Sequence, residues 1–314
     1  MVGAEAVIDR TDIQKAQRQI TSFIRYTPVI ALEKKAFGVP GRLWLKLESM
    51  QHTGSFKVRG AFNRILASAV PSVGVIAASG GNHGAAVAYA ARKLGYPAEI
   101  FVPEIASPVK VDRIKSYGAT VTIVGRNFAE ALNASLQQAE KTGALVVHAY
   151  NQPEVIAGQG TIGCELEQQA PDLDTLLVAV GGGGLIGGIS AWYANRVKVV
   201  AVEPELSAAF HAARKAGQPI DIVASGIAAD SLGARRAGEL MFAIAQHYVA
   251  ESVLVSDQAI RLAQQSLWQE LRLVTEPGGA TALAALLAGA YQPEPNERVG
   301  VLICGANTDP ETVK

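Results

Sequence analysis

Cysteine and charge are both scarce in this chain of 314 residues. Its two cysteines, Cys164 and Cys304, cannot form the dense disulfide framework of a small secreted domain, so we expect reduced thiols and a cytoplasmic protein. Charged residues make up 18% of the chain, and 28 basic residues balance 28 acidic ones. A net charge of zero without a basic run gives no electrostatic footprint for nucleic acid or an anionic membrane.

Long uncharged segments are almost missing as well. The N-terminal stretch carries Glu5, Asp9 and Asp12 and has no long apolar run, which excludes a signal peptide. The run 176–194 is uncharged and long enough for a membrane helix, but its six glycines favour a strand, a loop and a helix start instead. Hydrophobic residues still make up 49% of the chain, which suffices for the core of one large domain or two lobes.

Short apolar runs alternate with amphipathic stretches along the chain. A first helix is predicted from a cap at Thr11 or Asp12 to about residue 22. We predict strands over 43–47, 73–77, 98–102, 120–124, 145–147, 175–180, 197–202 and 299–303. Further helices are predicted over 56–66, from 84 to 94, and over 109–117, 128–141, 154–169 and from the glycine run to 194. This alternation predicts an α/β fold with parallel sheets in two lobes, with ligands in the cleft between them.

A lysine in an unusual setting follows the first predicted strand. Lys57 lies between Phe56 and Val58, just after the turn Thr53-Gly54-Ser55. The turn can aim backbone N–H groups at an anion, and the apolar neighbours can exclude water from the amine and lower its pKa, as a Schiff-base lysine requires. Taken alone, however, such a stretch more often marks an exposed lysine at the start of a helix.

The glycine run Gly181, Gly182, Gly183 and Gly184, followed by Leu185, lies between a predicted strand and a helix. Bare backbone N–H groups and the positive end of a helix make a phosphate site. No Lys-Ser/Thr pair follows, which excludes a nucleotide P-loop.

The same segment matches a second pattern. Gly182, Gly184 and Gly187 have the spacing of the dinucleotide fingerprint, and Glu203 ends the next strand, where an acid that binds ribose would lie. On this segment alone, an NAD-dependent oxidoreductase is as good an interpretation as a phosphate cradle.

Two further stretches favour a different cofactor. Ser79-Gly80-Gly81-Asn82-His83 joins a strand to a helix and suits a carboxylate or a polar ring substituent, although a plain helix cap explains it too. Cys304 ends a strand, and its thiol can hydrogen-bond a ring nitrogen, although a buried structural cysteine is commoner. A phosphorylated aldehyde cofactor needs an amine, a phosphate cradle, a ring-oxygen donor and a ring-nitrogen partner. All four are available, whereas a nicotinamide enzyme needs neither Lys57 nor the second loop.

Together these stretches resemble the pyridoxal-phosphate enzymes of the tryptophan-synthase β-subunit fold (fold type II), and within them the serine/threonine dehydratase and serine racemase branch. The matching motifs occur in family order over nearly the whole chain: 46–48, 53–61, 79–83, 155–161, 181–185, 276–280 and 304–307. Val58 and Arg59 after the lysine favour the dehydratases over the cysteine synthases, which usually have Asp there. The resemblance implies a large cofactor-binding domain, 1–66 plus 152–314, and a small substrate-loop domain, 67–151.

The resemblance also assigns roles to individual residues. Lys57 would hold pyridoxal 5'-phosphate covalently and later take the Cα proton of the substrate. The other assignments are Phe56 beside the ring, Asn82 on the ring hydroxyl, Gly181, Gly182, Gly183, Gly184 and Leu185 around the phosphate, Cys304 at the pyridine nitrogen, and Ser79, Gly80, Gly81, Asn82 and His83 at the substrate carboxylate. Glu276 would lie near the ring and the substrate side chain, unless it is only a helix N-terminal acid before Pro277.

The reaction implied is β-elimination from a hydroxy amino acid such as L-threonine or L-serine, giving a 2-oxo acid and ammonia. A serine, threonine or 3-hydroxyaspartate racemase and a 3-hydroxyaspartate ammonia-lyase are alternatives, but Gly80 stands where the racemases carry a serine base. A non-catalytic cofactor-binding protein is a third.

The resemblance bears on metal binding and assembly as well. Glu203 is a candidate metal ligand, yet Ala209 stands where the partner Asp is expected, which argues against activation by a divalent metal. The family usually forms dimers or larger assemblies, so a homodimer or homotetramer is expected.

Overall fold

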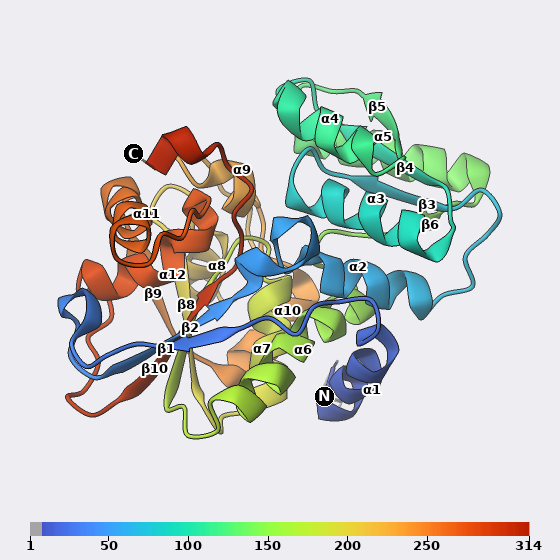
Figure 1. The fold of residues 1–314 in the computed structure, drawn as a ribbon. Helices are drawn as coiled ribbons and strands as arrows, with labels where there is room; N and C mark the ends of the chain where they lie inside the picture. The colour runs from blue at the N-terminus through green and yellow to red at the C-terminus, as the bar shows by residue number, and fades with distance from the viewer. Residues whose placement is uncertain (1–7, 314) are drawn as a thin grey trace.

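The computed structural model describes residues 8–313, which form an α/β structure with two separate sheets (Figure 1). Glu5, used above against a signal peptide, lies outside the described residues. The larger sheet has the order β1-β2-β10-β7-β8-β9, and the smaller has the order β5-β4-β3-β6. Their strands are β1 (Val29–Ala31), β2 (Arg42–Leu47), β3 (Val75–Ala78), β4 (Ala98–Val102), β5 (Thr120–Ile123), β6 (Leu145–Val146), β7 (Thr175–Ala179), β8 (Lys198–Pro204), β9 (Val249–Val255) and β10 (Arg298–Ile303).

Helices lie on both faces of the larger sheet (Figure 1). They are α1 (Arg10–Ile20), α2 (Lys57–Leu66), α3 (Asn82–Leu94), α4 (Pro108–Ser116), α5 (Phe128–Thr142), α6 (Pro153–Gln169), α7 (Gly184–Tyr193), α8 (Ala209–Ala216), α9 (Ala229–Leu232), α10 (Glu239–Tyr248), α11 (Asp257–Leu271) and α12 (Pro277–Leu287). Because both faces are covered, all residues of β7 and almost all of β8 are buried.

The prediction of parallel sheets is confirmed for every described strand pair except one. β1 pairs antiparallel with β2, with Val29 opposite Lys46. The connection between them, residues 32–41, is shorter than the roughly dozen residues that a parallel crossover needs. An edge strand joined by so short a segment can only return antiparallel.

The first helix has a different cap from the one predicted. It begins at Arg10, and the side chain of Asp9 accepts the N–H groups of Thr11 at 2.7 Å and Asp12 at 3.0 Å. The Asp12 carboxylate in turn accepts the N–H of Asp9, which completes a capping box. Thr11 and Asp12 are therefore inside the helix, and the prediction was wrong by two or three residues.

The uncharged run 176–194 divides into β7, a loop and α7, as predicted. Within residues 8–313, none of the helices combines the length and the hydrophobicity that crossing a bilayer would take.

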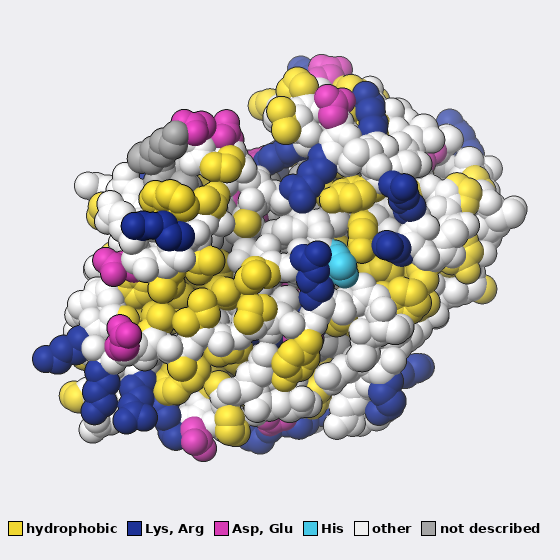
Figure 2. Space-filling view, viewed as in Figure 1, with side chains coloured by type: hydrophobic (Ala, Val, Ile, Leu, Met, Phe, Trp, Pro, Cys, Tyr) yellow, Lys and Arg dark blue, Asp and Glu magenta, His cyan; other side chains and the backbone are white. Residues whose placement is uncertain are grey.

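Each sheet has its own core. The smaller sheet packs against α3, and α3 packs against α2, whose Val58, Phe62 and Ile65 belong to the same core. The four strands of this sheet all lie within residues 75–146. We propose on this basis that 67–151 form the small domain and the rest of the described chain the large one, with α2 at the seam between them. In the surface view, hydrophobic side chains gather over the large lobe and basic side chains are dispersed (Figure 2).

Candidate active site

Lys57 is the first residue of α2, and the preceding turn ties it to the end of β10. The turn needs left-handed backbone at Thr53 (φ 59°) and Gly54 (φ 73°). Ser55 forms an isolated bridge with Gly305, and the N–H of Phe56 donates to the carbonyl of Cys304 at 3.3 Å. These contacts place the lysine at the carboxyl edge of the larger sheet, where ligands of such folds bind.

The amine of Lys57 has one polar partner, the carbonyl oxygen of Ala149, at 2.8 Å. Burial lowers its pKa to about 8, although the nearby Cys304 and Glu276 act in the opposite direction. At mildly alkaline pH a large fraction of the amine is therefore neutral and able to act as a nucleophile or base.

The glycine run Gly181–Gly184 connects β7 to α7, and two of its positions have no room for a side chain. Gly183 has φ +91°, and a Cβ there would lie 2.0 Å from the methyl carbon of Met241. A Cβ on Gly182 would lie 2.3 Å from the ring of Tyr150. α7 has no side-chain N-cap, so the N–H groups at its start point their positive end at the loop.

The amine, the glycine run and the proposed ring contacts line one cavity. Its lining is Phe56, Lys57, Asn82, Tyr150, Ala179, Gly181, Gly182, Gly183, Gly184, Leu185, Ser231, Leu232, Glu276 and Cys304. Every residue predicted to bind the cofactor is among them. An amine, bare backbone donors, an amide and a thiol in one cavity are the donor set that a phosphorylated aldehyde requires, so the residues present fit pyridoxal phosphate.

Cys304 is buried in this cavity and its thiol lies 3.3 Å from the carbonyl oxygen of Gly278, to which it donates. Burial, followed by the charge of Glu276, raises the pKa of the thiol well above its usual range. The thiol is thus neutral and cannot supply a charge to a ring nitrogen.

Glu276 and Asn82 meet across the cleft. The amide nitrogen of Asn82, at the start of α3, donates to Oε1 of Glu276 at 2.6 Å, and Asn307 donates to the amide oxygen of Asn82. Burial raises the pKa of Glu276, while Asn82 and the cations Lys110, Arg113 and Lys57 oppose that rise. Glu276 thus precedes α12 and also lines the cavity, so its role at the ring stays a prediction.

Asn82 is the member of the predicted substrate loop that lines this cavity. The side chain of His83 is buried, and its Nε2 lies 2.8 Å from the carbonyl oxygen of Val147. Burial lowers the pKa of His83 to about 3, with Lys57 adding to the effect. The imidazole is therefore neutral and occupied, so only the backbone of His83 is free to bind a carboxylate.

Some lining residues were not predicted. Tyr150 covers the glycine run, and its hydroxyl donates to the carbonyl of Arg236 at 3.3 Å. Ser231 and Leu232 come from α9. Each is an ordinary residue in an ordinary stretch of sequence, and only the fold brings it to the cavity.

Glu203 lies outside this cavity. Its two carboxylate oxygens accept the N–H groups of Phe210 at 2.8 Å and His211 at 2.7 Å, at the start of α8. Burial raises its pKa to about 7 against these hydrogen bonds. In residues 8–313 no group of three or more His, Cys, Asp or Glu side chains is arranged to hold a metal ion. In these contacts the Glu203 carboxylate caps the N–H groups at the start of α8.

Comparisons with known proteins agree with this geometry. A family model described as "Pyridoxal-phosphate dependent enzyme" matches residues 20–305. The chain is 37% identical to L-threonine ammonia-lyase of Thermotoga maritima, covering 96% of this chain and 76% of that protein. It is also 37% identical to phenylserine dehydratase of Ralstonia pickettii, covering 97% of this chain and 94% of that protein. The structure of maize serine racemase superposes with a TM-score of 0.91 at 33% identity, covering 98% of this chain and 96% of that chain.

These likenesses confirm the resemblance, the fold class and the cofactor predicted from the sequence. They also favour a pyridoxal-phosphate enzyme over the NAD-dependent oxidoreductase considered above. Because that model matches far more than half of the sequence, this chain belongs to the pyridoxal-phosphate dependent enzymes.

Proposed function

We propose that this chain is an ammonia-lyase that removes the β-hydroxyl and the amino group of a hydroxy amino acid, such as L-threonine or L-serine, to give a 2-oxo acid and ammonia. The observation that carries the proposal is one cavity that Lys57, the glycine run, Asn82, Glu276 and Cys304 line together. Two of the relatives, each 37% identical to this chain, are named L-threonine ammonia-lyase and phenylserine dehydratase.

When bound, pyridoxal phosphate supplies a covalent attachment point for the substrate amine and a ring that withdraws electrons from the Cα–H bond. In our proposal Gly181–Gly184 and Leu185 hold its phosphate. Asn82 donates to the ring oxygen, Phe56 packs beside the ring, and Cys304 faces the ring nitrogen. Each of these residues lines the same cavity.

Lys57 is the base in this proposal. Its low pKa, about 8, keeps enough neutral amine to accept the Cα proton. The carbonyl of Ala149 accepts a hydrogen bond from the amine and holds it on the cavity side of α2. The neutral thiol of Cys304 would face the ring nitrogen of a bound cofactor without giving it a charge, so the ring would withdraw electrons less strongly than a protonated one.

The substrate carboxylate is assigned to the loop Ser79, Gly80, Gly81, Asn82 and His83 at the start of α3. Backbone N–H groups at a helix N-terminus attract an anion. Since the His83 imidazole is neutral, the backbone and the helix end, not a histidine cation, provide the positive potential.

A racemase is the second candidate, because the fold matches maize serine racemase closely. A Cβ at Gly80 would lie 2.7 Å from that of Ala106, so the position at which the racemases of this branch carry a serine base is occupied by a neighbour. This contact favours elimination. The preferred substrate among threonine, serine and 3-hydroxyaspartate stays open to experiment.

A substrate screen tests the proposal. The purified holoenzyme is incubated with L-threonine, L-serine, phenylserine and 3-hydroxyaspartate, with and without magnesium, and 2-oxo acid, ammonia and the enantiomers of the substrate are measured. We expect 2-oxo acid and ammonia in equal amounts from at least one of them. Borohydride reduction and peptide mapping should find the pyridoxyl group on Lys57. A protein labelled at Lys57 that releases no 2-oxo acid from any of these substrates would refute the lyase.

Assembly and location are also proposals. We propose a homodimer or homotetramer, which light scattering coupled to size-exclusion chromatography tests directly. A cytoplasmic location stays a prediction from the scarcity of cysteine.

A further inference from the structure

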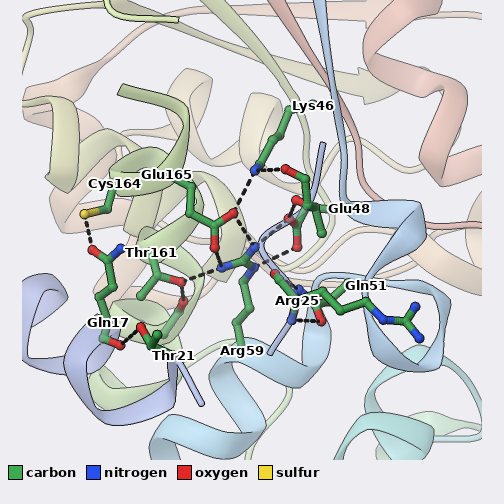
Figure 3. Close-up of polar contacts among 12 residues, drawn as sticks. Gln17, Thr21, Arg25, Lys46, Glu48, Gln51, Arg59, Thr161, Cys164 and Glu165 are labelled. Carbon is green, nitrogen blue, oxygen red and sulfur yellow. Dashed lines mark hydrogen bonds and ion pairs between the residues drawn. The ribbon is translucent and has the colours of Figure 1, made fainter. Parts of the chain in front are cut away.

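Four charged side chains are buried together beside α2, and we call them the buried ionic cluster: Lys46, Glu48, Arg59 and Glu165 (Figure 3). Lys46 lies in β2, Glu48 directly after it, Arg59 in α2 and Glu165 in α6. Lys46, Glu48 and Arg59 are 0% exposed and Glu165 is 3% exposed. Two cations and two anions make the cluster neutral, so no charge is left uncompensated in the interior.

Arg59 is the centre of this cluster. Its Nε and Nη2 donate to the two oxygens of Glu48 at 2.8 and 2.7 Å. Nη1 and Nη2 donate to the two oxygens of Glu165 at 2.8 and 2.9 Å, and Nη1 also donates to Thr161 at 3.1 Å. These bonds use all five N–H donors of a guanidinium. The planar fork therefore has one permitted position and orientation.

Arg59 follows Lys57 by two residues on the same helix, which places the two side chains about 200° apart around its axis. Lys57 points into the cavity, and Arg59 points into the large lobe. The first turn of α2 has no side-chain N-cap. A fixed Arg59 consequently sets the rotation and the depth of the turn that carries the lysine.

Arg59 is connected to the glycine run through α6. A Cβ on Gly158 of α6 would lie 2.7 Å from the carbonyl oxygen of Arg59, so the backbones of α2 and α6 touch. A Cβ on Gly188 of α7 would lie 2.2 Å from the carbonyl oxygen of Ile156, so α6 and α7 touch as well. Helices in backbone contact cannot slide independently. The position of α2 on α6 therefore determines where the Lys57 amine lies relative to the start of α7.

We propose that Arg59 is a positioning residue whose fork to Glu48 and Glu165 fixes the Lys57 amine relative to the glycine run. The inference rests on the proposed covalent role of Lys57. A buried ion pair is poor evidence for stability, because apolar residues of the same volume often stabilise a fold as much. What the ion pair adds is direction: its hydrogen bonds hold the side chains in one geometry.

The test removes the fork while keeping the interior neutral. The double variant Arg59→Met/Glu48→Gln deletes one positive and one negative charge and leaves Lys46 paired with Glu165. Leu166→Ala, at a fully buried position of the same helix α6, is the control that destabilises without touching the fork. Arg59→Lys keeps the charge and loses the fork geometry. Thermal unfolding of each protein is measured first, so that variants of similar stability are compared.

The readouts are the dissociation constant for pyridoxal phosphate, the pH profile of borohydride trapping at Lys57, and kcat and KM. We expect the double variant to bind the cofactor at least tenfold more weakly, to trap it at least tenfold more slowly at pH 7.5, and to lose kcat more than KM. Arg59→Lys should fall between it and wild type. Leu166→Ala should stay within threefold of wild type in trapping.

Three results separate the possibilities. Wild-type trapping in a folded double variant overturns the positioning role, and so does an equal loss in Leu166→Ala at equal stability. If the double variant does not fold, Arg59→Lys decides by the same criteria. Absence of trapping in the wild type itself refutes the proposed function instead, so the two failures are distinguishable.

Discussion

Two lysines on either side of the turn at 53–55 differ in their surroundings: Lys46 is completely buried and Lys57 is half-buried. The amine of Lys46 is completely buried and donates to Glu165 at 2.7 Å, to Gln169 at 2.8 Å and to the carbonyl of Thr27 at 2.9 Å. Burial lowers the pKa of Lys46, while Glu48 and Glu165 oppose the change. The amine of Lys57 has one carbonyl partner and a pKa of about 8.

The difference shows that burial alone does not make a lysine a nucleophile. Carboxylate partners oppose the loss of a proton from the buried amine of Lys46, whereas the hydrogen-bond acceptor of the Lys57 amine is a neutral carbonyl. The carboxylates follow the same division. The guanidinium of Arg59 and the ammonium of Lys46 hold the pKa of Glu48 low against burial, and burial raises that of Glu276, which has only an amide as its close partner.

Replacing each lysine by methionine should affect activity at Lys57 and stability at Lys46. Lys57→Met should lower kcat/KM by at least about 10²–10⁴-fold, the range of a general base, with little loss of stability. Lys46→Met leaves the buried ionic cluster with one excess negative charge, because Arg59 alone then faces Glu48 and Glu165, and should lower the free energy of unfolding by about 3–5 kcal/mol. Steady-state kinetics and urea unfolding measure the two effects, with the exposed Lys34→Ala as the control. A Lys57→Met protein with normal turnover would contradict the assignment.

Glu48 and Glu276 should differ in how much stability the protein loses when each is replaced by glutamine. Glu48→Gln breaks the charged fork with Arg59 and should cost about 3–5 kcal/mol of stability. Glu276→Gln keeps an oxygen that can accept from Asn82, so its cost should be about 1 kcal/mol or less. Chemical denaturation of the two proteins at pH 7.5 gives the comparison. Equal losses would mean that the Arg59 contact contributes no more than the Asn82 contact.

The stability of the protein and the reactivity of Lys57 should both depend on pH because of the low pKa of this amine. In the unfolded chain its pKa is the ordinary 10.5, and in the folded protein it is about 8. Between these values the unfolded chain binds a proton that the folded chain does not. The contribution to stability is thus fully present above 10.5 and is lost as the pH falls to 8. We expect the rate of cofactor capture by the apoprotein to rise with pH, with a midpoint near 8. A midpoint near 10 would show that the amine is not desolvated.

The smallest effect is expected at the cysteines. Burial raises the pKa of Cys164 to about 11 and that of Cys304 further. Both thiols are nearly inaccessible, at 6% and 3% exposure. Because the thiolate is the reactive form, the folded protein should show no alkylation by iodoacetamide at pH 7.5 under conditions that label the unfolded chain completely. Mass spectrometry of both samples decides it, and labelling of the native protein would contradict the burial.

Local sequence predicted much of the fold. The strand predicted over 98–102 is β4 (Ala98–Val102), and the helix predicted over 154–169 matches α6 (Pro153–Gln169) to one residue. Between β8 and β10 no strand and no full helix was predicted, apart from a possible helix start at Pro277, although this region forms β9 and α8 to α12. Residues 278–286 of α12 are buried at every position, so this helix has no polar face and no helical period in its sequence. The antiparallel β1 and the Asp9 cap were likewise missed, because each depends on how a short segment is placed.

The sequence by itself determined the alternation of strands and helices and the motifs that resemble a family, since these depend on neighbours a few residues apart. Tertiary structure decided which charged groups surround each lysine and which residues line the cavity. Lys57 meets Ala149 and Cys304, and Arg59 meets Glu165, across more than ninety residues of chain. A pKa depends on the groups within a few ångströms, and for these side chains the fold alone brings those groups together.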